Sequence, residues 1–195
     1  KYRQYILASD LNWGRLTAWR NLIASFWDVA DYREHLNGID GIVIEYDPPD
    51  ESKGEVAAQA LLVAGWLASR LKWQVGGEFQ RDAGGVRWTL GAGGGREIAL
   101  EMRATADRHD CDGLIASLTL KASGAEFYAA VNQEWTKLET SAKIGDAQKV
   151  GRVVAYEAKS EGQRLSRELG LLTRDAVYEE SVATASRLIE ALKKS

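Results

Sequence analysis

The chain has 195 residues, a formal net charge of −3 and an isoelectric point near 5.6, which argues against a nucleic-acid-binding surface built from basic patches. Its longest uninterrupted apolar run covers residues 60–68, far short of the roughly 20 residues that span a bilayer, and its first residues are too polar for a signal peptide. Its single cysteine, Cys111, cannot form an internal disulfide, which fits a reducing cytosol. From these features together we expect a soluble cytoplasmic protein with neither a membrane nor a nucleic acid as partner.

The first predicted elements are a short strand and a helix. Residues 5–8 are apolar and strand-like. The next apolar side chains recur at helical spacing: Leu16, Trp19, Ile23, Phe26 and Ala30. This spacing predicts an amphipathic helix that runs to about Val29, with Asp10 or Asn12 as its N-cap.

A turn, a strand and a second helix are expected next. The turn falls at residues 37–38 and the strand at 42–46, and two prolines end that strand because they cannot donate to a ladder. Ser52 and Glu55 have capping-box spacing, and the apolar stripe behind them predicts a helix over residues 53–71.

The middle of the chain predicts strands. Five segments between Trp73 and Val131 alternate apolar and polar residues, and short glycine-containing connections separate several of them, which favours an antiparallel meander. Residues 136–158 fit a strand or a helix. Further helices are predicted over 159–169, with Gly170 as C-cap, and over 173–193, with Thr173 or Asp175 as N-cap. We therefore expect a single mixed α/β (α+β) domain, residues 1–195, with a largely antiparallel sheet packed against several helices.

Two motifs suggest chemistry, but neither is complete. The glycines at 91–95 lack the last glycine of a G-x-G-x-x-G register, where Arg96 stands, and strands flank them, which favours a hairpin turn. Residues 108–112 contain His109 and Cys111, but no third catalytic group is evident, and His35 is the only other histidine, expected in a loop. One cysteine and two histidines also fall short of a zinc site. We predict no catalytic residue, no metal and no cofactor.

Trp13, Arg15 and Arg20 are the candidate partner-binding residues. Tryptophan and arginine dominate protein-binding hot spots, and these three lie on the first turns of the predicted helix. The alternative is structural: Arg15 and Arg20 would form ion pairs with Asp10 or Asp28, and the tryptophans on apolar positions, such as Trp19, would lie in the core. Residue types alone favour the partner-binding role and the structural role equally.

Residues 10–28 contain the pattern D-L-x-W-x-R-L-T-x-W-R, followed by V-I-E-Y-D-P at 43–48 and E-L-G-L-L-T-R-D-A-V-Y-E-E at 168–180. With these three motifs in this order, the chain resembles the glucose-6-phosphate dehydrogenase assembly protein (OpcA) family. The resemblance implies a non-catalytic domain that binds glucose-6-phosphate dehydrogenase and promotes its assembly or allosteric activation in the oxidative pentose phosphate pathway. It also implies the C-terminal domain of a longer protein, and it favours the interface role of Trp13, Arg15 and Arg20.

A second function class stays open. The chain could be a small cytosolic enzyme or a sugar-phosphate-binding protein in which His109, or Arg15 and Arg20, holds an anionic group. Redox control, which is associated with the family, would have to act through an N-terminal portion outside this sequence or an intermolecular bond, since the chain has one cysteine. The sequence leaves self-association open.

Overall fold

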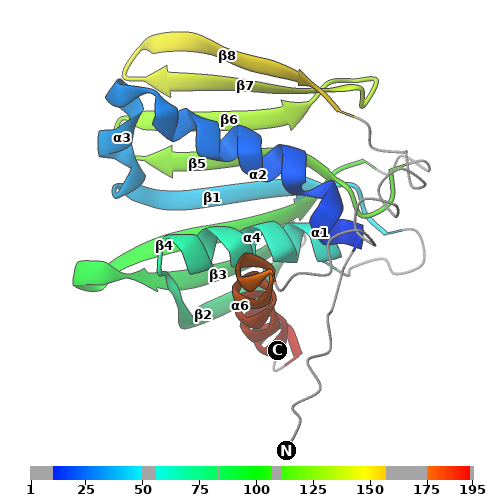
Figure 1. Cartoon of the computed structure of the whole chain (residues 1–195). Coiled ribbons are helices and arrows are strands. Elements are labelled where there is room, and N and C mark those ends of the chain that lie inside the picture. Colours follow the sequence, from blue (N-terminus) through cyan, green and yellow to red (C-terminus); the bar gives the residue numbers. More distant parts are fainter. Residues whose placement is uncertain (1–10, 50–55, 83, 107–110, 157–174, 194–195) are drawn as a thin grey trace, which may run out of the picture.

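The computed structural model describes residues 11–49, 56–82, 84–106, 111–156 and 175–193. Within them the strands form one sheet of eight, in the order β2-β3-β4-β1-β5-β6-β7-β8 (Figure 1). The strands are β1 (Ile39–Tyr46), β2 (Gln74–Asp82), β3 (Gly85–Ala92), β4 (Arg96–Ala104), β5 (Ile115–Ala122), β6 (Ala125–Val131), β7 (Lys137–Ile144) and β8 (Ala147–Ala155). The helices are α1 (Leu11–Arg15), α2 (Thr17–Ala24), η1 (Ser25–Asp28), α3 (Ala30–Leu36), α4 (Ala58–Arg70), η2 (Gly93–Gly95) and α6 (Ala176–Lys193).

The expected mixed fold with a mostly antiparallel sheet is confirmed, with one difference in topology. Strand β1 separates β4 from β5, pairs parallel with β4 and antiparallel with β5, and so divides the meander in two. Ile42 and Ile44 of this strand are buried beside Leu100 and Met102 of β4 and Leu118 and Leu120 of β5, so the three strands share one continuous apolar face. The undecided stretch 136–158 contains two strands, β7 and β8.

The helices differ from the predictions mainly at their ends. The expected helix up to Val29 is divided into α1, α2 and η1, although Arg20 N–H still donates to Leu16 O at 2.8 Å across the first division. The expectation that His35 lies in a loop was wrong, because α3 carries it. Helix α4 begins at Ala58 and not at residue 53 as predicted, because Ala57 has the extended ψ of 136°. Helix α6 begins one residue after Asp175.

Several predicted features lie outside the described residues. They are the strand at 5–8, the cap at Asp10, the Ser52–Glu55 capping box, His109, the helix at 159–169, the cap at Gly170 and the alternative cap at Thr173.

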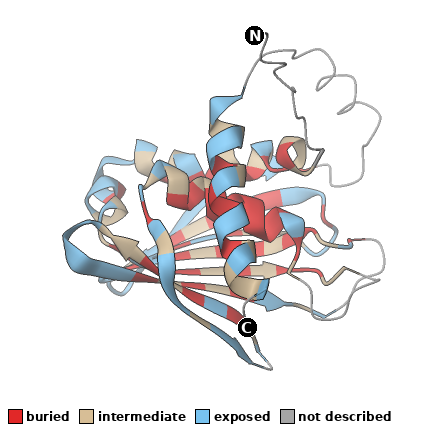
Figure 2. Ribbon diagram, turned by 90° about the horizontal axis from the view of Figure 1, so that it is seen from below, coloured by how far each residue is buried: buried red, intermediate tan, exposed pale blue. Residues whose placement is uncertain are grey.

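The helices α1 to α4 and α6 lie on one face of the sheet, and the core lies between the two layers (Figure 2). Phe127 on β6 is fully buried and contacts Phe26, Trp27 and Tyr32, with ring centroids 4.9–5.3 Å apart. Trp19 and Trp88 are also buried, as expected for tryptophans on apolar positions. None of the described helices is long and apolar enough to cross a membrane.

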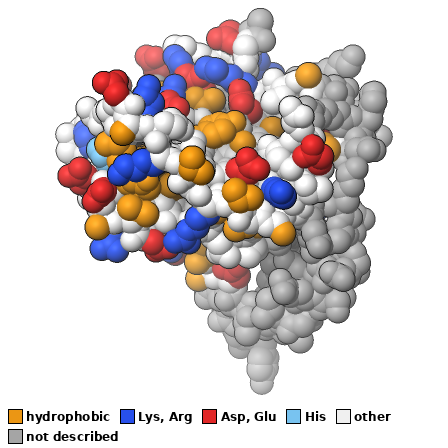
Figure 3. Space-filling model, turned by 90° about the horizontal axis from the view of Figure 1, so that it is seen from above, with side chains coloured by type: hydrophobic (Ala, Val, Ile, Leu, Met, Phe, Trp, Pro, Cys, Tyr) orange, Lys and Arg blue, Asp and Glu red, His pale blue; other side chains and the backbone are white. Residues whose placement is uncertain are grey.

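Strand β8 is one edge of the sheet, and Figure 3 views the molecule from this side. Its Val150 is 91% exposed and Val153 is 56% exposed. Two basic side chains of the strand reach over to the helical layer, since Lys149 lies 3.6 Å from Asp31 and Arg152 lies 3.5 Å from Asp28. Charged side chains on an edge strand discourage pairing with other chains, so this edge is protected in part.

Helices α4 and α6 approach closely because α4 has a glycine at the contact. A Cβ at Gly65 would lie 2.4 Å from the carbonyl oxygen of Ser181 and 3.0 Å from the amide nitrogen of Ala185. No side chain fits there without moving one helix. The position of α6 on the molecule therefore depends on a hydrogen atom in place of a side chain at residue 65.

We predict that Gly65→Ala destabilises the protein. Overpacking costs about 1–3 kcal/mol, which outweighs the gain of about 0.5–1 kcal/mol from replacing a helix-interior glycine. Urea denaturation measures the free energy of unfolding. The matched control is Gly76→Ala, because a Cβ at Gly76 meets nothing within 4 Å. Equal stability of the two variants would contradict the close approach.

Candidate protein-interaction site

Trp13 lies at the meeting point of the first and last described helices. It is 6% exposed, and its indole Nε1–H donates to Asp175 Oδ2 at 2.8 Å. Its ring also packs against Tyr178 on α6, with centroids 5.5 Å apart and a tilt of 47°. A large aromatic ring with one satisfied polar atom is well suited to such a contact, because the apolar body is buried and the N–H keeps a partner. Trp13 thus joins two segments 162 residues apart in the sequence.

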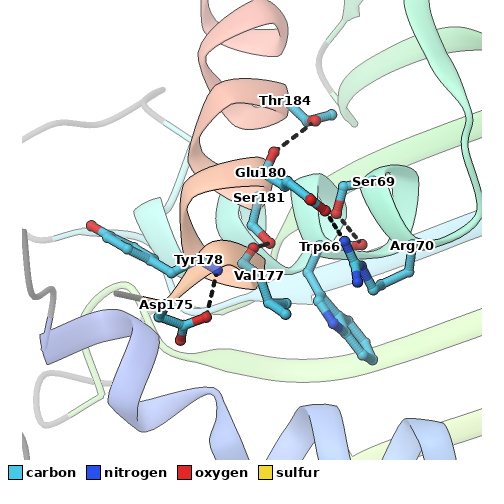
Figure 4. A network of polar contacts seen from close by, with 9 residues as sticks. All are labelled: Trp66, Ser69, Arg70, Asp175, Val177, Tyr178, Glu180, Ser181 and Thr184. Carbon is cyan, nitrogen blue, oxygen red and sulfur yellow. Dashed lines mark hydrogen bonds and ion pairs between the residues drawn. The ribbon is translucent and has the colours of Figure 1, made fainter. Parts of the chain in front are cut away.

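Asp175 serves both helices at once. Its Oδ1 accepts from the backbone N–H of Tyr178 at 2.9 Å, which is N-cap geometry for α6 and confirms the predicted cap (Figure 4). Burial alone would raise the pKa of this carboxyl. The hydrogen bonds from Tyr178 and Trp13 and the nearby positive charge of Arg20 outweigh burial, so the pKa of Asp175 lies below its ordinary value.

Arg20 covers the other side of Trp13. Its guanidinium carbon lies 3.5 Å from the centroid of the indole ring, a cation–π contact, and Nη2 donates to Thr17 Oγ1 at 3.1 Å. The side chain is only partly buried. Arg20 therefore presents one surface to Trp13 and another to solvent, beside a negatively charged carboxylate.

The structure brings together two of the three candidate residues. Trp13 and Arg20 stack, while Arg15 lies at the end of α1 with a partly exposed side chain. The charge beside Arg20 is that of Asp175 and not of Asp28, which lies 3.5 Å from Arg152 instead. Sequence reasoning identified Asp175 as a possible cap but missed its bond to Trp13.

The same surface continues along the contact between α4 and α6. Arg70 on α4 forms an ion pair with Glu180 on α6 (Figure 4). Gln59 on α4 is 1% exposed, and its Nε2 donates to Asn12 Oδ1 at 3.4 Å, which links α4 to α1. We call Trp13, Arg20, Gln59, Asp175 and Tyr178 the helix junction. Its members come from α1, α2, α4 and α6 with the cap residue Asp175, and Gln59 is linked to the rest through Asn12 on α1, so the cluster joins four helices.

The glycine-rich segment is a hairpin connection, as predicted. Strands β3 and β4 pair antiparallel on either side of it, with Ala92 opposite Arg96. Gly94 has φ 76° and Gly95 has φ 76°, which glycine adopts without strain. A short turn between paired strands does not offer the free N–H groups of a helix N-terminus to a phosphate.

The histidine and cysteine candidates are not brought into a described site. His109 lies outside the described residues, and Cys111 is buried, 5% exposed, and forms no disulfide. His35 packs against Phe127 with centroids 6.1 Å apart. Among the residues that the structure describes, no group of three or more His, Cys, Asp or Glu side chains could hold a metal ion.

Comparison with known proteins gives a family and a fold. A family model for the C-terminal domain of a glucose-6-phosphate dehydrogenase subunit, OpcA, matches residues 6–182. Two curated relatives are both named OxPP cycle protein OpcA. The one from Nostoc punctiforme is 29% identical over 192 residues, which cover 93% of this chain and 40% of the relative. The one from Synechocystis sp. is 30% identical over 193 residues, which cover 93% of this chain and 39% of the relative. The chain thus spans about two fifths of their length.

Solved structures share the fold at low sequence identity. The 3-ketoreductase KijD10 from Actinomadura kijaniata, in complex with NADP and TDP-benzene, matches with a TM-score of 0.52 and 13% identity, over 94% of this chain and 60% of that chain. The oxidoreductase yvaA from Bacillus subtilis matches with a TM-score of 0.51 and 10% identity, over 95% of this chain and 62% of that chain. At such identities the likeness concerns the fold alone.

We predict that Trp13→Phe lowers the free energy of unfolding by about 1 kcal/mol, because it keeps an aromatic ring but removes the hydrogen bond to Asp175. Combined with Asp175→Asn, it should cost less than the sum of the two single changes in urea denaturation.

Since the folded-state pKa of Asp175 is lowered, its stabilisation is present above the unfolded-state pKa and is lost as pH falls through the folded-state pKa. Wild type and Asp175→Asn should therefore converge in acid.

The matched control is Trp27→Phe, which makes the same chemical change in η1, where the ring packs on Phe127. It should show no coupling to Asp175→Asn. Additive effects of Trp13→Phe and Asp175→Asn would mean that the hydrogen bond contributes nothing measurable.

Proposed function

The chain belongs to the OpcA family, and on that premise we propose that it is a non-catalytic domain that binds glucose-6-phosphate dehydrogenase and promotes its assembly or allosteric activation in the oxidative pentose phosphate pathway. The observation that carries the proposal is the match of the family model to residues 6–182. The names of the curated relatives support the same pathway. A cytoplasmic location follows from that role.

The composition of the described sites supports a binding role over catalysis. The helix junction consists of aromatic, amide and paired charged side chains, without a nucleophile beside a base. The oxidoreductase neighbours do not decide the matter, since a shared fold hosts many functions.

Activation by a non-catalytic domain has a thermodynamic requirement. Such a domain raises the activity of an enzyme only if it binds the active conformation or oligomer more tightly than the inactive one. We propose that the outer side of α1 and α2 makes part of this contact, with Arg15 and Arg20 reaching carboxylates of the dehydrogenase. Trp13, which is 6% exposed, would act mainly by fixing the position of Arg20.

We expect Arg15→Ala and Arg20→Ala each to weaken dehydrogenase binding by about 2 kcal/mol or more, because truncating one charge of a desolvated pair leaves the other unpaired. Calorimetric titration gives the affinity and thermal denaturation gives the stability. The matched control is Arg187→Ala, since Arg187 is an exposed arginine of α6, outside α1 and α2 and outside the sheet. A lower melting temperature with unchanged affinity would assign the two arginines to the fold alone.

We also expect the double variant His109→Ala, Cys111→Ala to activate the dehydrogenase as the wild type does. Neither side chain has a catalytic role under this proposal. The measurement is dehydrogenase activity against the concentration of added domain, with circular dichroism to show that the variant is folded. A loss of more than about tenfold, equivalent to 1.4 kcal/mol, in a folded variant would support the enzyme or sugar-phosphate alternative instead.

A further inference from the structure

The face of the sheet opposite the helices, which we call the open face, has a pocket. The pocket has a volume of about 250 Å³ and lies where β1, β5 and β6 meet the loop between β6 and β7. Its lining includes Glu45, Ser117, Tyr128, Asn132, Gln133 and Trp135. Pockets for cofactors and drug-sized ligands usually occupy about 300–1,000 Å³, so this one suits a smaller group such as one side chain.

A carboxylate is held in this pocket in a fixed position. Ser117 Oγ donates to Glu45 Oε2 at 2.6 Å, and Ser117 is 4% exposed. The two residues lie opposite each other on β5 and β1, with their side chains on the open face. Because an ionised carboxylate has about four acceptor positions, the bond from Ser117 leaves Glu45 able to receive further donors, including a bidentate guanidinium.

Two aromatic residues line the same pocket. Tyr128 on β6 is 39% exposed, while Trp135 is 8% exposed. Trp135 has φ 56°, a left-handed conformation that costs a tryptophan about 1–3 kcal/mol. Asn132 holds it there: its carbonyl accepts from Trp135 N–H at 3.0 Å, and its Oδ1 accepts from Thr136 N–H at 2.8 Å.

The charges of the pocket favour a cation. Among the described residues that line it, Glu45 is the only one with a charged side chain. The nearest basic residue by strand register is Arg103, opposite Glu45 on β4, and its guanidinium forms an ion pair with Glu101. Glu101 also pairs with Arg87, so Arg103 is part of a separate charge cluster on the neighbouring strands. Aromatic rings next to a carboxylate attract a guanidinium or ammonium group through cation–π and charge contacts.

We propose that this pocket receives the side chain of an arginine or lysine from a protein partner, and that the open face around it is a second docking surface of the domain. The partner is the dehydrogenase, so the inference rests on the proposed function. Glu45 accepts the donors of the cation, Tyr128 covers its apolar stem, and Ser117 and Asn132 keep the acceptor and the loop in position.

The test is titration of the dehydrogenase with the full chain and three variants. Glu45→Gln keeps the shape and the acceptor for Ser117 but removes the charge, so we expect affinity to fall about tenfold or more. Tyr128→Ala should weaken binding as well, and neither change should lower the melting temperature by more than a few degrees. The matched control Glu126→Gln removes a charge from β6 on the same face but outside the pocket, and should bind as the wild type does.

Titration with N-acetyl-arginine methylamide separates the two proposals. It should bind the wild-type chain weakly, shift the amide resonances near Glu45, and lose this effect in Glu45→Gln. If the wild-type chain binds the arginine probe but not the dehydrogenase, the proposed partner is wrong and the cation pocket stands. If the dehydrogenase binds wild type and Glu45→Gln within twofold of each other, or the probe has no effect on wild type, the pocket proposal is overturned.

Discussion

The fold depends on covering one face of a wide sheet. Buried side chains such as Ile44, Leu100 and Phe127 point to the same side of strands that alternate with polar residues. The covering layer is built from both ends of the chain, since α1 and α2 come before the first strand and α6 follows the last one. Contacts between these helices therefore have to be made across the full length of the sequence. The bond from Trp13 to Asp175 meets that requirement, and the close approach at Gly65 holds α6 against α4, which lies between β1 and β2 in the sequence.

Much of the fold was predictable because its signals are local. The alternation at Val86, Trp88 and Leu90 identifies β3, and Gly91 to Gly95 identifies the hairpin that follows. The central place of β1 was not predictable, because a strand that enters between β4 and β5 leaves no mark on their own alternation. Helix α3 was missed since its seven residues contain one buried apolar side chain, Tyr32, and no stripe.

The candidate sites show the same division between local and distant information. The tryptophan and arginines of the first helix were visible as residue types that favour interfaces, but their partner Asp175 lies far along the chain and could be recognised only as a cap. The pocket on the open face gave no signal at all. Glu45 and Ser117 are ordinary solvent-side positions of two strands, and only the register of β1 against β5 places them together.

The helix junction and the open face are held in place by different parts of the fold. The helix junction is built from contacts that also hold α6, so a partner that binds Arg20 there would be sensitive to the stability of the helical layer. The open face rests on strands whose position is fixed by the sheet ladder, and its pocket keeps its shape through Ser117 and Asn132 without help from any helix. The affinity of a partner that contacts both surfaces at once would depend on the spacing between the two layers of the domain. Under the proposed function, such a contact offers one physical route to tighter binding of one dehydrogenase assembly over another, because two sites with a fixed separation fit only one arrangement of the groups that they bind.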